Sequence, residues 1–391
     1  MFSRIPLSPL LYQRGAGGVP ATSMLLPLMR SRINRIEWSI TDKFGFESCT
    51  IQCTGTKEEA LSFMNELGAS LLITGPDADE CWSGRLVAVA ATLGQERHSR
   101  SLDGMYNRVR VRFTTPTNVS GVTPAVSDTT SQGFYGVRDL VESLPKCVWD
   151  AAVLRSKRVL DKTRWPVKTP ASEVRTGELG QVDFSLTFEG WYGSLGYVMT
   201  SRSDKTKEQT TTQVGALIGT SSPGIGATNP FLNTSTSLIT ASGVSDTRFI
   251  AEDTTYRDKI EGLLSQGNSA EQAFSWGVYE DRTLRVDVWA GATPTTVTYR
   301  CSLGNRQVLN SAKSIVPFWR VRPNAMYEIT DLLDVNPRSD EPDAAGRYYL
   351  ARVTFWCDRN GMGVRLEPSD SGGRGGNLAA QLAQLTVRFG S

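Results

Sequence analysis

Residues 44–55 read FGFESCTIQCTG, and in this stretch the apolar Cys49, Ile51 and Cys53 alternate with polar neighbours. An apolar residue at every second position is typical of a strand with one buried face. Residues 179–190, LGQVDFSLTFEG, align with this stretch without a gap and keep the alternation in register. The match suits two related sheets, but twelve residues are few enough for two alternating strands to agree by chance. Both explanations stay open, and both predict a β-rich chain.

The segments around this strand predict further strands and one short helix. Residues 33–40 alternate in the same way. Thr56 is followed three residues later by Glu59, which is the spacing of a capping box, and Gly68 ends the helix that they begin. Alternating segments then resume between 70 and 113. The residues expected on the buried face of the helix are Ala60, Phe63, Met64 and Leu67.

The last of these alternating segments carries charge on one face only. Arg108, Arg110 and Arg112 alternate with three apolar residues, which predicts a strand with one buried and one basic side. One explanation is a solvated sheet face. The other is a surface that lines a channel or contacts another subunit, and for that role these three arginines are the candidate site residues.

Polar stretches and predicted elements alternate further along the chain. Residues 114–133 are rich in Thr, Ser, Val and Gly and predict a loop or extended linker. Pro145 predicts the first turn of a helix that stops at Trp165-Pro166. Residues 203–245 contain few large apolar side chains, which predicts a long, poorly packed insertion or surface loop.

A helix and a hairpin are expected after this stretch. Residues 255–266 predict a helix that ends before Gly267, and 276–288 predict a hairpin with its turn at 280–283. The residues that align on one face of this helix are Tyr256, Ile260, Leu263 and Leu264. Later segments predict strands at 327–330 and 348–356, a hinge SGGRGG at 371–376, and a short tail with Leu378, Leu382 and Leu385.

Composition and charge exclude several classes of protein. The 391 residues are 39% hydrophobic and 21% charged, which is too apolar for a disordered chain, and they suffice for two or three domains. A net charge of +2 supplies no strong field toward nucleic acid or a membrane. No stretch approaches the 18 or so apolar residues of a membrane span. The first acidic residue is Glu37, so a basic N-terminal arm precedes it, and its prolines argue against a transit peptide.

The residues that commonly carry catalysis are scarce. His98 is the single histidine, and no nucleophile elbow, zinc helix or phosphate loop is present. The six cysteines show no C-x-x-C spacing, so they are expected to be reduced and buried, and no metal or other cofactor is expected. Asp77, Asp79 and Glu80 could supply carboxylates for glycoside hydrolysis, although Asp is also common in turns.

Several short runs resemble one family. CWSGRL at 81–86 and SLDGMYNRV at 101–109 follow the order strand, strand, capped helix, strand, and YGVR at 135–138 precedes a helix. Later runs are GWYGSLGY at 190–197, TYRD at 255–258, GVYEDRTL at 277–284, and VRP at 321–323 before YEITDL at 327–332. In order and kind these runs resemble the tail hub proteins, also called baseplate hub or tail tip proteins, of tailed bacteriophages. The resemblance extends over roughly residues 33–365.

The resemblance implies a mainly β fold with short helices (α+β), in which two tail-tube-like β-barrel or sandwich domains carry inserted segments. The expected divisions are a basic arm at 1–32, a first β domain at 33–200 with a helical insert at about 134–165, a Ser/Thr/Gly-rich insertion at 201–250, a second β domain at 251–370, and a Gly-rich hinge with a tail at 371–391.

The function implied is that of a non-enzymatic structural component of the virion tail, made in the host cytoplasm. Three copies would form a hub ring that joins a hexameric tail tube to a threefold tip, beside tube, distal tail and spike proteins, with DNA passing through the lumen. The alternatives are a hexameric distal tail adaptor, a cell-wall or polysaccharide hydrolase of the tip, and a carbohydrate-binding module.

Overall fold

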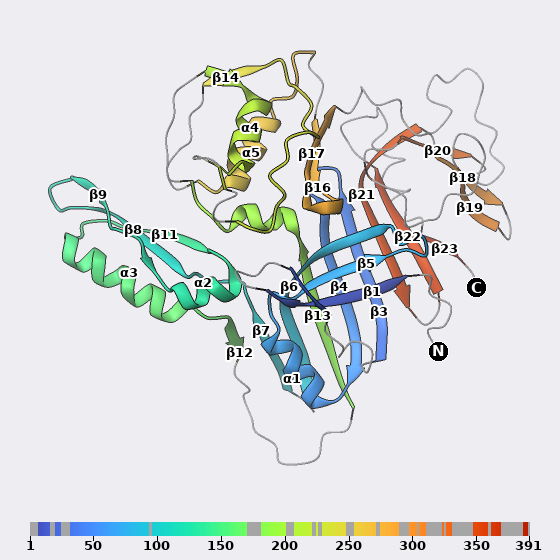
Figure 1. Ribbon diagram of the computed structural model, residues 1–391, viewed down its shortest axis with the longest axis horizontal. Coiled ribbons are helices and arrows are strands. Elements are labelled where there is room, and N and C mark those ends of the chain that lie inside the picture. Colours follow the sequence, from blue (N-terminus) through green and yellow to red (C-terminus); the bar gives the residue numbers. More distant parts are fainter. Residues whose placement is uncertain are drawn as a thin grey trace.

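The structure, a computed structural model, describes residues 7–15, 20–24, 32–93, 96–169, 181–200, 207–220, 224–225, 229–247, 254–270, 274–288, 297–302, 305–309, 323, 326–330, 347–358, 361–368 and 386–389. It is mainly β with short helices, which confirms the predicted fold class (Figure 1). A large β body carries a helical unit above it and a side lobe, residues 106–166, that projects to the left.

Four long antiparallel strands form the centre of the body. They are β3 (Arg32–Thr41), β4 (Gly45–Gly55), β13 (Val182–Gly190) and β6 (Glu80–Leu93), paired in that order. Their inward side chains form the largest apolar core, in which Trp38 of β3 stacks on Phe355 with ring centres 5.1 Å apart. This core holds the body together because burial of aromatic and aliphatic surface is the main favourable term in folding.

The two matching segments of the sequence are neighbours in this sheet. Ile51 of β4 lies opposite Leu186 of β13, and Cys53 lies opposite Phe184. Because the strands run antiparallel and side chains alternate, the apolar positions of both point into one core. Of the two explanations left open for the match, two related sheets does not apply to these segments, because both belong to one sheet.

The helix α1 (Lys57–Asn65) packs on the β6 and β13 part of this sheet. The predicted capping box is present: the Glu59 amide donates to the Thr56 hydroxyl at 3.2 Å, and the Thr56 amide donates to the Glu59 carboxylate at 2.8 Å. Phe63 meets Phe184 with ring centres 5.6 Å apart. All four residues predicted for the buried face of this helix are buried.

The strand β6 also holds the edge strands of the body. It pairs with β5 (Ser70–Thr74) and β7 (Glu96–Ser101), and β7 pairs with the short β12 (Val167–Thr169). Part of the basic N-terminal arm, β1 (Ser8–Arg14), lies antiparallel on β5 and carries β2 (Pro20–Met24). These residues of the arm therefore extend the sheet.

Strands from the end of the chain complete the other side of the body. The strand β21 (Arg347–Asp358) pairs with β3 and β22 (Gly361–Pro368), and β22 pairs with β23 (Thr386–Phe389). A smaller group follows, with β20 (Met326–Thr330) between β21 and β18 (Val297–Ser302), and β19 (Asn305–Leu309) beside β18. The strands predicted at 327–330 and 348–356 are confirmed. The predicted hinge at 371–376 and the three leucines of the tail lie outside the described residues.

The helical unit has its own apolar core. It comprises η3 (Trp191–Gly196), α4 (Thr210–Ile218), α5 (Tyr256–Leu264) and the hairpin of β16 (Phe274–Val278) and β17 (Leu284–Val288), joined by η4 (Glu280–Arg282). A small ribbon of β14 (Lys207–Gln209) and β15 (Ser245–Thr247) lies beside α4. The predicted helix at 255–266 and the hairpin are confirmed, and the four residues predicted for the buried helix face are buried.

The prediction of a poorly packed stretch at 203–245 is wrong. Val214 and Leu217 of α4 and, further along, Ile225 and Phe231 are buried in the core of the helical unit. Small polar residues fill the space between these few large ones, and Thr210, Thr211 and Gln213 are buried as well. A stretch rich in Ser, Thr and Gly can thus pack tightly when its few apolar residues all reach one core.

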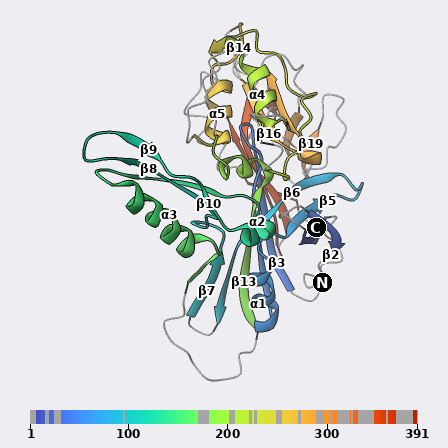
Figure 2. The ribbon, with the colours of Figure 1, turned by 60° about the vertical axis from the view of Figure 1, so that its left-hand side comes forward.

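The side lobe consists of a small sheet with one long helix. Its strands are β8 (Arg108–Thr114), β9 (Ser120–Val122), β10 (Val126–Ser127) and β11 (Asp139–Leu144), and its helices are α2 (Thr129–Tyr135) and α3 (Trp149–Thr163). Figure 2 shows this lobe standing away from the body. The prediction of a linker at 114–133 is wrong for β9, β10 and α2, because their backbone groups pair with β8 or are capped by Asp128.

The helix α3 starts later than Pro145 predicts. Lys146 has a left-handed backbone with φ 51°, and the Cys147 amide donates to the Thr114 carbonyl at 2.8 Å. This turn places Pro145 outside the helix, which begins at Trp149 and ends before Trp165-Pro166, as expected.

Five cysteines have described side chains and all five are free thiols, and all except Cys147 are buried. Burial raises the pKa of the Cys53 thiol to about 12, so it stays protonated. Among the described residues, no helix has the length and hydropathy that a membrane crossing requires. The expected domain divisions at 32, 200, 250 and 370 stay predictions.

Candidate functional site

The three arginines proposed from the sequence lie on β8, in the side lobe. Val109, Val111 and Phe113 are buried against α3, and the arginines point to the other face, as the alternation predicts. Arg112 is exposed and Arg110 is half-buried. The strand therefore presents two arginines on its basic face, while Arg108 has a different role.

Arg108 forms an ion pair inside the protein. It donates twice to the Asp139 carboxylate of β11, through Nε and through Nη2, the latter at 2.6 Å. The Asp139 side chain is only 2% exposed and also accepts the Met199 amide at 2.9 Å. The carboxylate raises the pKa of Arg108 above its ordinary value. This pair joins the side lobe to the helical unit, so Arg108 is a structural residue.

A second group of charged residues, which the sequence gave no reason to single out, lies where the three parts meet. Arg85 of β6 is 2% exposed and donates to the Tyr135 carbonyl at 2.7 Å. Arg138 lies over the Tyr197 ring at 3.9 Å, and the Tyr197 hydroxyl donates to the Glu189 carboxylate. Burial lowers the pKa of Arg85 to about 10 and raises that of Tyr197. These groups hold the body, side lobe and helical unit together.

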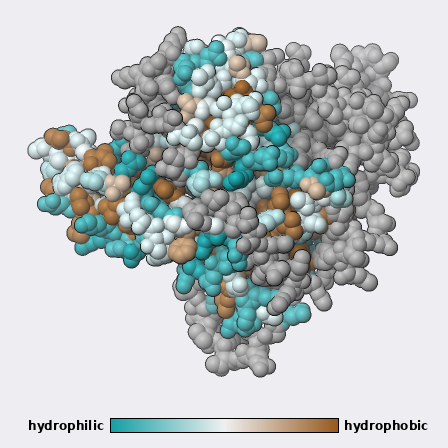
Figure 3. All heavy atoms as spheres, viewed as in Figure 1, coloured by the Kyte–Doolittle hydropathy of each residue, from teal (hydrophilic) through white to brown (hydrophobic). Residues whose placement is uncertain are grey.

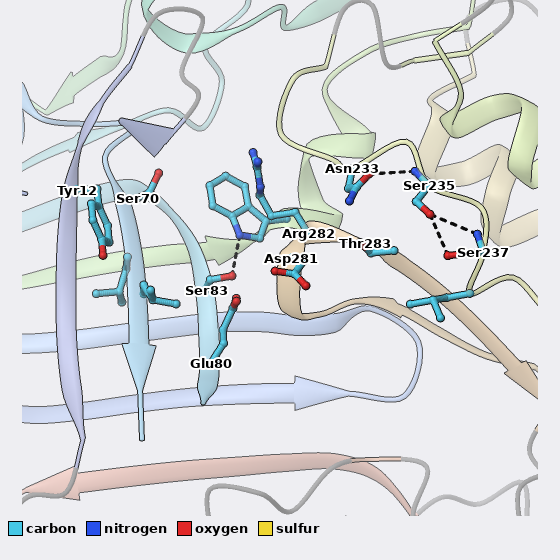
Figure 4. A pocket seen from close by; sticks show the side chains of 14 residues that line it. Tyr12, Ser70, Glu80, Ser83, Asn233, Ser235, Ser237, Asp281, Arg282 and Thr283 are labelled. Atoms are coloured by element: carbon cyan, nitrogen blue, oxygen red, sulfur yellow. Dashed lines mark hydrogen bonds between the residues drawn. The ribbon is translucent and has the colours of Figure 1, made fainter. Parts of the chain in front are cut away.

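A cleft of about 600 Å³ opens between the body and the helical unit. Its walls come from β1, β5 and β6 on one side and from η3, residues 233–238 and the η4 turn on the other. Figure 4 shows Glu80, Ser83 and Asp281 pointing toward one another at its floor. The Trp191 indole donates to the Ser83 hydroxyl at 2.9 Å and so fixes that hydroxyl.

Two carboxylates of this cleft are brought together by the fold. Burial is the main cause that raises the pKa of Glu80, while bonds from Ser83 and from the Asp281 backbone lower it. Glu80 was considered as part of the 77–80 turn, and the structure places it beside Asp281 of a distant hairpin. The group can accept hydrogen bonds from a hydroxyl-rich ligand, since carboxylate and hydroxyl oxygens are acceptors.

The turn that carries Asp281 has an unusual sequence for its shape. Asp281 and Arg282 both have left-handed backbones, with φ of 57° and 58°. Tight hairpin turns with two such residues favour Asn-Gly or Asp-Gly, because most other residue types are strained in a left-handed backbone conformation. The sequence EDRT between two strands was thus a signal that the side chains of this turn matter.

The single histidine does not join the carboxylates of the cleft. His98 lies on β7, opposite Ala91 of β6, and is not among the residues that line the cleft. In the described ranges, no three His, Cys, Asp or Glu side chains are arranged to hold a metal ion.

Comparison with known proteins gives distant structural similarity and no sequence match. No protein-family model matches the chain, and no curated protein matches it. The tail protein from Neisseria meningitidis MC58 is similar with a TM-score of 0.39 and 10% identity, over 93% of this chain and 97% of that one.

Two further structures are similar over most of the chain. The 43 kDa tail protein of prophage MuSo2 from Shewanella oneidensis has a TM-score of 0.41 and 8% identity, over 92% of this chain and 97% of that one. A component of the Escherichia coli type VI secretion system has a TM-score of 0.34 and 8% identity, over 84% and 71%. All three TM-scores lie below 0.5, which is too low to assign the chain to a family.

Proposed function

We propose that this chain is a structural subunit of a bacteriophage tail tip or baseplate, a hub ring that joins the tail tube to a threefold tip. What supports this proposal most is where the residues of the hub-like motifs lie. Asn107, in the run at 101–109, is fully buried and donates to the Gly136 carbonyl at 2.8 Å. Its side-chain oxygen accepts the Arg138 amide, also at 2.8 Å. These motif residues thus hold two separate segments of the side lobe together, which is a structural role.

The sheet edges also favour an assembly. Within the described ranges, the short strand β12 pairs only with β7, and β23 pairs only with β22. Unpaired strand edges are satisfied in natural proteins by covering elements or by neighbouring copies. A ring of identical subunits provides such neighbours and requires no reactive pocket. Tube, distal tail and spike proteins would be the other partners, and the virion tail would be the location.

The experiment that tests this proposal is the mass and symmetry of the purified particle. Three copies around one axis, seen by light scattering and electron microscopy, are the expected result. Six copies would favour a distal tail adaptor instead. A chain that stays monomeric at every concentration would contradict both structural roles.

A hydrolase of the tip is the second candidate, because of the carboxylates in the cleft. A retaining or inverting glycosidase needs two such groups, one with a raised pKa, and burial raises the pKa of Glu80 beside Asp281. A zymogram on host cell wall tests it. Clearing that is lost in Glu80→Gln and in Asp281→Asn would establish this activity, and no clearing by the unaltered chain would reject it.

A further inference from the structure

Exposed apolar side chains are concentrated on one part of the molecule. Ten large apolar side chains of the described residues are exposed, and eight of them lie between 119 and 167, in or next to the side lobe. Figure 3 shows apolar residues on the lobe at the left. Apolar patches that stay exposed on a soluble protein usually mark contact surfaces. The lobe is therefore the strongest candidate for a contact with another macromolecule.

The outer surface of α3 combines apolar and basic residues. Trp149 and Leu154 are each 48% exposed, and Lys157 and Arg158 are exposed beside them. Arg158 follows Leu154 by four residues, so both lie on one face of the helix. Trp149 is held in place by an edge contact with Phe113, with ring centres 5.8 Å apart. The neighbouring Leu154 and Arg158 thus present an apolar and a basic side chain together, and arginine is enriched at protein interfaces.

The side lobe is basic, and the rest of the chain is not. Residues 106–166 contain ten Lys and Arg against five Asp and Glu, whereas the remainder contains 32 against 35. Four of the five acidic residues already face an arginine of the lobe: Asp128, Asp139, Glu142 and Asp161. The lobe therefore carries a net positive charge.

The cleft offers a complement to that charge. The charged residues that line the cleft are the carboxylates of Glu80 and Asp281 and one arginine, Arg282. Leu238, one of the two exposed apolar residues outside the lobe region, also lines the cleft. The lining of the cleft thus has one more carboxylate than cations and is partly apolar, whereas the lobe is basic and partly apolar.

The lobe and the cleft lie on different sides of the molecule. In Figure 2 the lobe extends to the left, whereas β5, which lines the cleft, extends to the right. A contact between two different patches of the same chain repeats from copy to copy and closes into a ring when the rotation permits. Complementary charge on the two patches orients such a contact.

We propose that the α3 surface of one copy docks into the cleft of the next copy, with Arg158 facing Asp281 and Leu154 near Leu238. This inference rests on the proposed function only in that the chain forms an oligomer. In this arrangement the contact between neighbouring copies of the ring is head-to-tail. The carboxylates of the cleft then bind a neighbouring copy of the chain and not a substrate.

A charge exchange between the two patches tests this contact. The full chain is compared by light scattering with Arg158→Glu, with Asp281→Arg, and with both changes in one chain. We expect each single change to weaken association at least tenfold and shift the mass toward the monomer, and the double change to restore the oligomer. Lys57→Glu, an exposed reversal on α1, is the matched control and should leave the mass unchanged.

The outcomes separate this inference from the proposed function. An oligomer whose mass is unaffected by Arg158→Glu and Asp281→Arg would overturn the docking and leave the hub role intact. An unaltered chain that is monomeric would overturn both. Circular dichroism shows whether each variant is folded, and a variant that fails to fold is replaced by Lys157→Glu or Leu238→Ser. Binding of duplex DNA or anionic vesicles that Arg158→Glu abolishes, with the oligomer mass unchanged, would assign the lobe to that ligand instead.

Discussion

The guanidinium carbon of Arg85 lies 4.5 Å from the centre of the Phe231 ring, inside the protein and without a carboxylate bonded to it. Its Nε and Nη1 find no hydrogen-bond partner among the described residues. Phe231 belongs to the core of the helical unit and Arg85 to the central sheet, so this contact joins two cores. A buried charge of this kind is costly, and its packing must compensate for part of that cost.

We therefore expect Arg85 to stabilise the protein mainly through the volume that its side chain fills, and less through its charge. Arg85→Met keeps most of the volume and removes the charge, so we expect the free energy of unfolding to stay within about 1 kcal/mol of the unaltered chain. Arg85→Ala leaves a cavity and should cost about 3 kcal/mol. Urea denaturation measures both. Equal losses in the two variants would mean that the charge itself holds the junction.

Arg108 and Arg112 belong to the same strand, but we expect their replacement by Ala to lower the stability of the protein by different amounts. Arg108→Ala leaves the buried Asp139 carboxylate without its ion-pair partner and should cost about 3 kcal/mol or more. Arg112→Ala, at an exposed position, should change stability by less than about 0.5 kcal/mol. Thermal unfolding compares the two. Adding Asp139→Asn to Arg108→Ala should restore part of the loss, because the unpaired charge is removed.

Gly45 is required by its conformation and by the approach of β16. Its φ is +75°, and a Cβ placed on it would lie 2.3 Å from the Val278 carbonyl oxygen. Gly45→Ala should thus destabilise the protein by about 2 kcal/mol or more. Gly262→Ala is the control: it lies in α5 with no atom near its Cβ position, and should stabilise by about 0.5 kcal/mol. A loss at both sites would point to general intolerance of substitution.

Asp42 predicts how stability depends on pH. Burial raises the pKa of this carboxyl from 3.8 to about 6. The folded state then holds the proton of Asp42 more tightly than the unfolded state does. The stabilisation that this proton provides is fully present below pH 3.8 and is lost as the pH rises through about 6. Asp42→Asn should remove this loss and be more stable than the unaltered chain at pH 7, by about 1 to 2 kcal/mol after allowance for solvent screening. Denaturation curves at pH 4 and pH 7 measure the difference, and equal pH dependence in both proteins would contradict the assignment.

Mixing two charge variants distinguishes a trimer from a hexamer. If Arg158 docks onto Asp281 of the next copy, a chain with Arg158→Glu and a chain with Asp281→Arg fit each other only in alternation. Alternation closes in a ring of six and not in a ring of three. If the native ring has three copies, an equal mixture of the two single variants should not reach the mass of that ring. The double variant by itself should reach it. Native mass spectrometry reads the composition, and a full three-membered ring from the mixture would exclude this geometry.

The elements that could be predicted from the sequence are those formed by interactions between residues close together in the chain. Thr56 and Glu59 are three residues apart, so the capping box that starts α1 could be recognised directly. The alternation of β4 and β13 likewise lies within each segment. That these strands are neighbours could not be predicted, because pairing depends on the whole sheet and not on either strand.

The candidate site was predicted only in part for the same reason. The alternation on β8 correctly placed Arg112 on an exposed face, but it could not show that Asp139 would take Arg108 out of that face. Glu80 and Asp281 meet through two turns that are far apart in the chain. Ile225 and Phe231 were overlooked because small polar residues surround them in the sequence, while their packing partners lie elsewhere.

The pairing of β3 with β21 has a consequence for how the protein is made. Arg352 of β21 bonds to Glu47 across a separation of 305 residues. A ribosome must therefore release the chain as far as Asp358, the end of β21, before the central sheet can gain this strand, and contacts so distant in sequence form slowly. Until then the strand β3 has an open edge on the nascent chain, where it can pair with the wrong neighbour.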